Sequence, residues 1–303
     1  MIIKKKIVTI IGLGLIGSSI LRAFSYYLKN KFYIKVYDNN SEHLKVVEAF
    51  NKADEICNSV EDSVKDSDLV ILAIPVGSMA EVGKLISPYL KKGAILTDTG
   101  STKLSVIKDL SLLIPKNVFL VPSPPLAGTE HSGPESGFAT LYDNRWCLII
   151  PGHDTDAKAV DRLRSLWEGM GANVDLMDAD HHDLVLAVTS HAPHLIAYTM
   201  VGVVNDLETV TESEIINYSA AGFRDFTRIA ASDPTMWRDI FLNNKEAHLE
   251  VLGRFTEELF SLQRAIRRED GDYLLKYFKR TRDIRKSIVE AGQDTKNPDF
   301  GRN

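Results

Sequence analysis

Gly12, Gly14 and Gly17 form a GxGxxG pattern directly after the short apolar run at residues 7–11. In such a pattern the first glycine permits a tight turn, the second lets a pyrophosphate approach the backbone, and the third allows a helix to pack closely on a strand. Asp38 lies 21 residues after Gly17, where a carboxylate can accept hydrogen bonds from both ribose hydroxyls of an adenosine. The pattern therefore predicts a dinucleotide site. Its expected members are Gly12, Leu13, Gly14, Leu15, Ile16, Gly17, Asp38, Ala73 and Pro75.

The residues after Asp38 bear on which dinucleotide binds. A carboxylate at this position repels a 2′-phosphate, and the neighbouring Asn39 and Asn40 supply no cation to compensate. The sequence thus favours NAD over NADP as the cofactor. Taken alone, the glycines also fit a tight turn that binds no ligand.

Two polar segments follow predicted strands: residues 98–103 read DTGSTK and residues 123–137 read SPPLAGTEHSGPESG. Open parallel sheets bind ligands beyond the carboxyl ends of their strands. Ser101 can donate to a substrate hydroxyl, and Glu130 can hydrogen-bond a polar ligand. The alternative for the second segment is a loop that its prolines merely stiffen.

Four of the eight histidines fall within residues 181–194. His191 and His194 are three residues apart and share a helix face, with Ser190 beside them. A zinc site needs a third ligand, and neither that ligand nor an HExxH spacing is evident, so no metal is predicted. Pro193 frees backbone polar groups next to these histidines, which favours a functional role for the pair.

The segment GFRDFTR places Asp225 and Arg228 three residues apart. Arginine presents a planar fork of donors that suits a carboxylate, and an aspartate can orient that fork. A surface salt bridge is the alternative for an arbitrary Asp–Arg spacing. Trp237 and His182 are expected to be packing residues of the core.

Short apolar runs alternate with helical patterns over the first half of the chain, which is typical of a parallel sheet covered by helices. Residues 1–178 are predicted to form a Rossmann-type, doubly wound α/β domain, which a short strand at 174–177 completes. Residues 179–303 are predicted to form an all-helical domain. The six expected sheet strands are 7–11, 33–37, 69–73, 94–97, 118–121 and 146–150. The expected helices of the second domain are 181–205, 211–219, 234–268 and 272–290.

The amino-acid composition limits the classes of molecule that the chain is expected to bind. Lys and Arg total 36 against 41 for Asp and Glu, the net charge is −5 and no basic block stands out, which argues against nucleic acid. Only two cysteines occur, Cys57 and Cys147, so no disulfide framework is expected and a reducing cytoplasm is the natural compartment. The apolar stretch 184–204 holds Ser190 and His191, which favours a buried helix over a membrane span. Such an apolar helix must bury side chains on several of its faces, and a second copy of the chain can supply the covering surface. The sequence therefore predicts a homodimer.

Five segments, in their order along residues 7–240, resemble the prephenate dehydrogenase family, which includes arogenate and cyclohexadienyl dehydrogenases. They are GLGLIG, DTGSTK, PLAGTEHSGPESG, HDLVLAVTSHAPH and GFRDFTRIAASDPTMW. The resemblance implies an NAD-dependent oxidative decarboxylation of prephenate or arogenate in tyrosine biosynthesis. It also implies a helical dimerisation domain, with the active site between the two domains.

The resemblance further implies roles for individual residues. Ser101 is expected between nicotinamide and the ring hydroxyl, and Ser190, His191 and His194 along the substrate. Ser101, His191 and His194 are the expected catalytic residues.

Four other residues are expected to hold or enclose the substrate. Arg228 is expected to grip a substrate carboxylate, with Asp225 positioning it. Thr129 and Glu130 are expected at the mouth of the site.

One position departs from the family pattern. The family usually has a histidine before the Pro-(Leu/Ile)-Ala-Gly segment, and it accepts the proton of the ring hydroxyl. Pro124 occupies this position, and a proline side chain cannot accept a proton. Either His131, His194 or a water takes over, or the chain is an impaired dehydrogenase.

Two rival functions follow. A β-hydroxyacid dehydrogenase shares the two-domain plan but uses a lysine on the helix after the nucleotide domain, and no lysine occurs between Lys158 and Lys245. A catalytically inactive protein that binds dinucleotide or prephenate is the second rival, and only Pro124 supports it.

Overall fold

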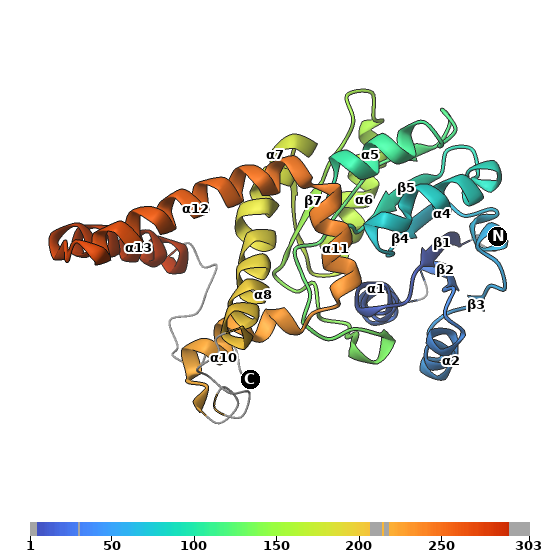
Figure 1. The fold of residues 1–303 in the computed structure, drawn as a ribbon. Helices are drawn as coiled ribbons and strands as arrows, with labels where there is room; N and C mark the ends of the chain where they lie inside the picture. Colours follow the sequence, from blue (N-terminus) through green and yellow to red (C-terminus); the bar gives the residue numbers. More distant parts are fainter. Residues whose placement is uncertain (1–4, 30, 207–213, 215–217, 291–303) are drawn as a thin grey trace. The chain divides into compact units, whose positions relative to one another are not determined.

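The computed structural model describes residues 5–29, 31–206, 214 and 218–290. Contacts divide the chain into two compact units, residues 1–248 and 249–303. The first unit holds a six-stranded sheet whose neighbouring strands are all parallel (Figure 1). The strands, in spatial order, are β3 (Glu55–Ile56), β2 (Phe32–Tyr37), β1 (Lys6–Ile11), β4 (Leu69–Leu72), β5 (Ile95–Asp98) and β6 (Phe119–Leu120).

The strand order confirms the predicted doubly wound fold, with two corrections. The run at 146–150 does not join the six-stranded sheet, because β7 (Trp146–Ile149) pairs with β8 (Asn173–Leu176) in a separate parallel pair. The sixth strand is instead β3, whose two residues are too few to show a periodic pattern. The boundary predicted at residue 178 stays a prediction.

Helices cover both faces of the sheet because successive strand side chains point to opposite sides. Val8 and Ile10 pack in one buried cluster with α1 (Leu15–Tyr27) and α6 (Ala157–Gly169). Ile11 packs in a second cluster, on the opposite face. The second cluster includes side chains from α3 (Val60–Val64), α4 (Met79–Ile86), α5 (Leu104–Ser111) and α11 (Pro234–Asn243). The remaining helix of this sheet is α2 (Ser41–Phe50), which packs with α1.

Local capping sets several of these helix starts. Asn40 accepts a hydrogen bond from Glu42 N (3.0 Å) at the start of α2, and Asp156 accepts one from Lys158 N (2.8 Å) at the start of α6. Asp233 caps α11, with Pro234 in the first turn. Side-chain oxygens at these positions satisfy N–H groups that a helix leaves unpaired.

The predicted helix at 181–205 is continuous but irregular. It comprises α7 (Ala179–Leu186), a π-helical turn (Ala187–His191) and α8 (Ala192–Asn205). The wide turn accommodates Pro193, which lacks an N–H and would clash with the carbonyl four residues earlier in a regular helix. The stretch Ala179–Val204 is long and apolar enough to cross a membrane by length and composition alone, and 22% of its most apolar window is buried.

The predicted helix at 234–268 is two helices, because α11 ends at Asn243 and α12 (Lys245–Arg267) begins after Asn244. Between α8 and α11 lies α10 (Ala221–Thr227). The predicted helix at 211–219 lies outside the described residues except for 214, 218 and 219.

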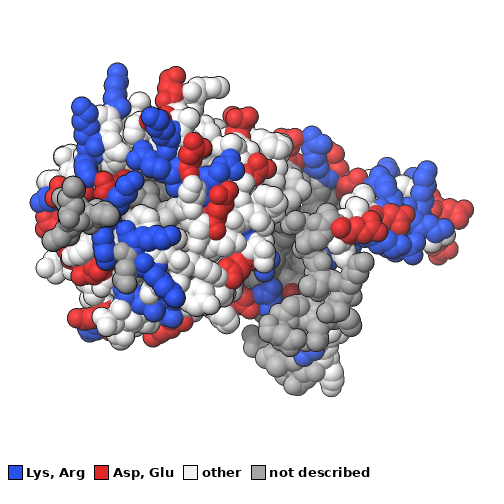
Figure 2. Space-filling model, turned by 180° about the vertical axis from the view of Figure 1, so that it is seen from behind, with Lys and Arg blue, Asp and Glu red and all other residues white. Residues whose placement is uncertain are grey.

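In the second unit, the rest of α12 is followed by α13 (Gly271–Glu290). Its helices expose large apolar side chains, among them Leu259, Phe260, Phe278 and Ile284. On the face of the molecule drawn in Figure 2, positive and negative side chains are interspersed.

Candidate active site

The glycine turn between β1 and α1 has space only for glycine at two of its positions. Gly12 has a φ of +90°, and a Cβ there would overlap the Ala73 carbonyl oxygen at the end of β4. A Cβ on Gly17 would overlap the Gly12 carbonyl oxygen. Beside Gly14, at the start of α1, there is open space, and no side chain caps the helix. Its first N–H groups therefore suit an anionic ligand such as a pyrophosphate.

Asp38 closes the same turn from the end of β2. Its Oδ2 accepts a hydrogen bond from Leu13 N (2.6 Å) and its Oδ1 accepts one from Asn40 N (2.8 Å). The His43 Nδ1 lies 3.2 Å from Asp38 Oδ2. This buried carboxylate is held against the glycine turn, and its remaining lone pairs suit ribose hydroxyls. No sequence motif marked His43, which lies in the first turn of α2, five residues after Asp38.

The other predicted cofactor residues flank this turn. Leu15 and Ile16 begin α1, and Ala73 follows β4 directly. Pro75 caps the 3₁₀ turn Val76–Ser78. All of them therefore lie at the carboxyl ends of β1 and β4, as the doubly wound fold requires.

Ser101 lies in the turn between β5 and α5, at the same edge of the sheet. Asp98 Oδ2 accepts a hydrogen bond from Gly100 N (2.8 Å) and also contacts Lys103 Nζ. Asp183, on α7, accepts hydrogen bonds from the backbone at the start of α5. Ser101 is half-exposed, whereas Asp98 and Lys103 are fully buried.

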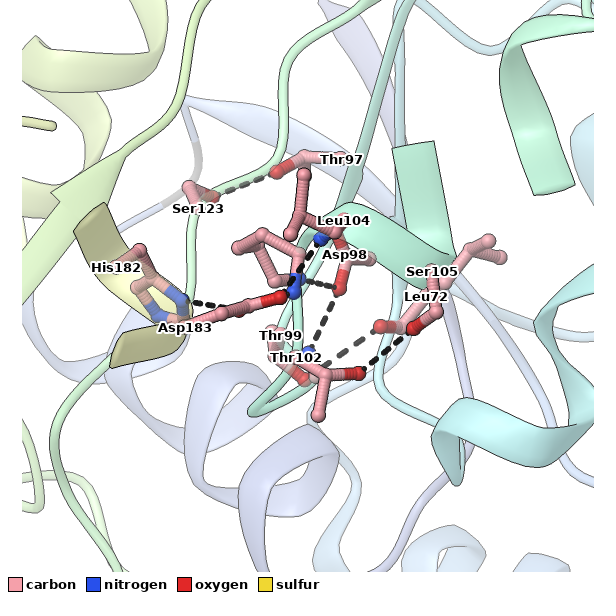
Figure 3. Close-up of polar contacts among 12 residues, drawn as sticks. Leu72, Thr97, Asp98, Thr99, Thr102, Leu104, Ser105, Ser123, His182 and Asp183 are labelled. Atoms are coloured by element: carbon pink, nitrogen blue, oxygen red, sulfur yellow. Dashed lines mark hydrogen bonds and ion pairs between the residues drawn. The ribbon is translucent and has the colours of Figure 1, made fainter. Parts of the chain in front are cut away.

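Pro124 lies beside this turn. Ser123 N donates to Asp98 O (3.1 Å), and Leu148 N donates to Pro124 O (3.1 Å). The Ser123 hydroxyl points into the core, where it contacts Thr97 Oγ1 (2.6 Å; Figure 3). Side chains alternate along an extended segment, so the Pro124 ring faces away from that core contact.

The histidines form a cluster with defined tautomers. His248 Nδ1 lies 3.2 Å from Phe241 O, and a carbonyl only accepts, so Nδ1 carries the hydrogen. Nε2 of a neutral His248 then accepts from His191 Nδ1 (2.8 Å), which leaves His191 Nε2 as an acceptor. Among the described residues, His191 Nε2 and Trp237 Nε1 are buried without a hydrogen-bond partner.

His194 is oriented in a different way. Its Nδ1 donates to Ser190 O (2.8 Å), so its Nε2 is the acceptor. Its ring stacks on Trp237 with centroids 3.8 Å apart. Trp237 is thus a packing residue, as expected, but its packing partner is a predicted site residue.

The pKa of each of these three histidines lies below the ordinary value of histidine, which favours the neutral form at pH 7. Burial lowers the pKa of His191 to about 3, with a smaller electrostatic contribution from the neighbouring His248. Burial also lowers the pKa of His194, and the nearby Arg228 guanidinium lowers it further, while the hydrogen bond to Ser190 opposes both. Burial lowers the pKa of His248 as well. A neutral imidazole nitrogen can accept a proton or a hydrogen bond.

Arg228 is paired with the loop that follows Pro124. Its Nη1 lies 2.6 Å from Glu130 Oε2. The backbone N–H of Glu130 and then the Arg228 guanidinium hold the pKa of this carboxyl below its usual range, against the effect of burial. Asp225 lies one turn before Arg228, and Thr129 is exposed. The structure therefore brings Arg228, Glu130 and His194 into one neighbourhood.

Two buried residues of this region, Asp183 and His248, carried no signal in the sequence that marked them, because both lie in patterns that fit ordinary helices. Lys103 ends the DTGSTK segment, but nothing in that segment indicated that its side chain would be buried. Their partners lie up to 80 residues away along the chain. Trp237 Nε1 and His191 Nε2 likewise became recognisable only in the folded chain. His131, by contrast, is exposed, and its backbone N–H donates to Thr129 Oγ1 (3.3 Å).

These features define a protein with a nucleotide-binding domain. They are a doubly wound sheet, a glycine turn after β1 and a buried carboxylate after β2, followed along the chain by a helical region. Residues 24–176 match the family model "Prephenate dehydrogenase, nucleotide-binding domain", and residues 178–280 match "Prephenate dehydrogenase, dimerization domain". The chain belongs to the prephenate dehydrogenase family. This membership confirms the resemblance and decides against the β-hydroxyacid dehydrogenase alternative.

Individual relatives agree. The cyclohexadienyl dehydrogenase of Zymomonas mobilis is 44% identical over 93% of this chain and 96% of its own. The prephenate dehydrogenase of Bacillus subtilis is 32% identical over 94% of this chain and 76% of its own. The crystal structure of a prephenate dehydrogenase from A. aeolicus in complex with hydroxyphenyl propionate and NAD+ has a TM-score of 0.86, at 34% identity, and covers 95% of this chain and 100% of its own.

Proposed function

We propose that this chain catalyses the NAD-dependent oxidative decarboxylation of prephenate or arogenate, in the cytoplasm, as a step of tyrosine biosynthesis. The observation that carries the proposal is the Ser101 turn. Hydrogen bonds join it to strand β5 of the nucleotide-binding sheet and to helix α7, which leads into the histidine cluster. A hydroxyl at this place can reach both a dinucleotide at the sheet edge and a substrate beside the histidines.

The glycine turn and Asp38 would hold the dinucleotide. The open space beside Gly14 and the uncapped start of α1 fit a pyrophosphate, and Asp38 fits the ribose of NAD. Bound NAD supplies the hydride acceptor. Loss of the ring carboxylate as carbon dioxide makes the ring aromatic, so the residues of the chain need only align the substrate and manage one proton.

His194 is the proposed proton acceptor for the ring hydroxyl. Its Nδ1 is committed to Ser190 O, so Nε2 carries the free lone pair. Burial lowers its pKa, which keeps it neutral at pH 7. The proton that His194 accepts during oxidation returns to the phenol oxygen after decarboxylation. Ser101 donates to the same hydroxyl oxygen. His191 lines the substrate, where its Nε2 can accept a hydrogen bond from the ammonium group of arogenate, because the single O–H of prephenate already donates to His194.

Arg228 is the proposed partner of a substrate carboxylate. A guanidinium binds a carboxylate with two parallel hydrogen bonds, and here it is already paired with the carboxylate of Glu130. A substrate carboxylate would compete with Glu130 for the same donors. Asp225 is proposed to orient Arg228, and Thr129 to lie with Glu130 at the entrance.

Pro124 is proposed to reduce turnover while leaving binding intact. Its ring cannot replace a histidine as a second proton acceptor, and the contacts of Asp38 do not involve it. This same residue favours the second candidate function, an inactive protein that binds dinucleotide or prephenate.

A homodimer is proposed from two observations. Residues 178–280 match a dimerisation domain. Helix α8 has three apolar side chains at the surface, with exposed fractions of 44% for Met200, 41% for Val201 and 51% for Val203. Covering those side chains with a second copy removes apolar surface from water. A membrane is the poorer cover, because His182 and Asp183, on α7 at the start of the same continuous helical stretch, are buried and hydrogen-bonded.

Formation of NADH with prephenate and with arogenate tests the function directly. Turnover with either substrate, reduced in a Ser101→Ala variant, is the expected result. If neither the unmodified protein nor a Pro124→His variant forms NADH although both bind NAD, the inactive binding protein is the correct alternative.

A further inference from the structure

A buried group of charges lies behind the Ser101 turn and plays no part in the proposed chemistry. Asp98 and Lys103 are both fully buried, and their side chains form an ion pair. Asp183 is 2% exposed and lies on α7, about 80 residues further along the chain. Figure 3 shows Asp183 pointing toward the start of α5.

The first part of this group sets the shape of the turn. Asp98 Oδ2 accepts Gly100 N (2.8 Å) and also contacts Lys103 Nζ, so one carboxylate oxygen binds both ends of the turn. Thr102 is buried, and its hydroxyl lies 3.0 Å from Ser105 Oγ. Ser101 is therefore held between anchored neighbours.

The second part sets where the turn lies. Asp183 Oδ1 accepts a hydrogen bond from Lys103 N (2.7 Å), and Asp183 Oδ2 accepts one from Leu104 N (2.9 Å). These N–H groups lie at the start of helix α5, whose own N-cap residue makes no side-chain cap. A carboxylate at this end also interacts favourably with the helix dipole. The cap that most helices take from a local residue is supplied here by another helix.

Asp183 is fixed on its own side as well. Asn244 Nδ2 donates to Asp183 O (2.8 Å), and His182 Nδ1 lies 2.8 Å from Asp183 Oδ1. The wide turn that leads to His191 and His194 begins four residues after Asp183. The Asp183 carboxylate also opposes the lowering of the pKa of His191 by burial.

Stability alone does not account for these charges. Well-packed apolar side chains commonly replace a buried ion pair without loss of stability, because burying charges costs solvation free energy. Two hydrogen bonds from adjacent N–H groups to one carboxylate, by contrast, define a direction and a distance.

We propose that Asp183 is a positioning residue that holds the Ser101 hydroxyl in register with the histidines of α7 and α8, while the Asp98–Lys103 pair maintains the shape of the turn. Asp183 acts through Ser101 and touches no substrate. The role of Ser101 in this inference rests on the proposed function.

A double-mutant cycle between Asp183→Asn and Ser101→Ala tests the inference. An asparagine keeps the shape but turns an amide N–H₂ toward one of the two backbone donors. With Ser101 present, we expect kcat to fall about tenfold or more, because small misplacements of a reacting group are costly, while KM for NAD changes by less than about twofold. In the Ser101→Ala background, Asp183→Asn should cause almost no further loss. Equal losses in both backgrounds would overturn the proposal.

The same cycle in binding separates this inference from the proposed activity. The dissociation constant of hydroxyphenyl propionate with NAD present replaces kcat as the readout. If the protein binds this probe but turns over neither substrate, the proposed activity fails, and coupling between the two positions in binding still decides the inference. A probe that does not bind at all, or binds without coupling, overturns it.

Two further variants guard against misfolding and charge effects. Asp180→Asn removes an exposed carboxylate from the same helix and should leave kcat and binding unchanged. The combined Asp98→Asn and Lys103→Met variant removes the buried charges together, while the asparagine oxygen still accepts Gly100 N. It should fold, bind NAD normally and lose kcat only when Ser101 is present. If it retains full kcat, the ion pair does not maintain the shape of the turn.

Discussion

Replacing Pro124 with histidine should raise turnover sharply. A positioned general base typically contributes about 10²–10⁴ in rate. His194 already offers one acceptor nitrogen, so we expect the gain to lie near the low end of that range, at about 10²-fold in kcat. The affinity for NAD should change little, because the residues around Asp38 are separate from position 124.

The backbone hydrogen bonding at residue 124 favours the substitution. Leu148 N donates to Pro124 O (3.1 Å), and in an antiparallel pair residue 124 would return its own N–H to Leu148 O. A histidine restores that donor, worth about 1 kcal/mol. Removing proline restores conformational freedom to the unfolded chain, which costs about 0.4–1 kcal/mol, so these two backbone contributions nearly cancel. Pro124 is buried, so its neighbours must also make room for the larger imidazole.

Formation of NADH over a range of pH is the assay. The Pro124→His variant should gain a limb in its pH–rate profile near the pKa of histidine. Pro122→His is the matched control. Pro122 O accepts a hydrogen bond from Ile150 N (2.9 Å), so a histidine here also restores a missing backbone N–H donor of the same strand pair, two residues earlier. No gain in rate is expected from this variant. If the unmodified protein turns over as fast as Pro124→His, another base is already sufficient, and His194→Ala and His131→Ala identify it.

Four further predictions follow from the same structure. Asp38→Ser should narrow the preference for NAD over NADP by about tenfold, because repulsion of the 2′-phosphate is removed; a higher kcat/KM with NADP in the unmodified protein contradicts the reasoning. Arg228→Lys should raise KM for prephenate about tenfold with KM for NAD nearly unchanged, since lysine lacks the planar fork; equal increases for both would indicate misfolding. Light scattering at micromolar concentration should give the mass of two chains, and a monomer that melts cooperatively refutes the homodimer. His191 has a pKa of about 3 in the folded chain, below its unfolded value, so the unfolded state binds more protons between these values. Unfolding in urea should therefore show stability falling as the pH is lowered from about 6.5 to 5, by up to about 1.4 kcal/mol per pH unit for this histidine, and a flat profile contradicts its burial as a neutral group.

The sequence by itself determined features that depend on residues close together in the chain. The GxGxxG turn and Asp38 after the second strand follow from local backbone geometry and short-range hydrogen bonds. The alternating apolar runs likewise predicted a parallel sheet with helices on both faces. Family motifs then extended this prediction to Ser101, His194 and Arg228, whose individual roles stay proposals.

Only the tertiary structure decided which distant groups meet. His191 contacts His248, which lies 57 residues further along the chain, and Lys103 N donates to Asp183, which lies 80 residues further along. The partner of Asp38 that the sequence analysis missed, His43, is close in sequence, but its contact depends on how β2 and α2 join. Strand membership shows the same limit: β3 joins the main sheet with two residues, whereas β7 pairs with β8. Hydrogen bonds and ion pairs between remote segments depend on how helices and strands pack, and residue periodicity carries no record of that packing.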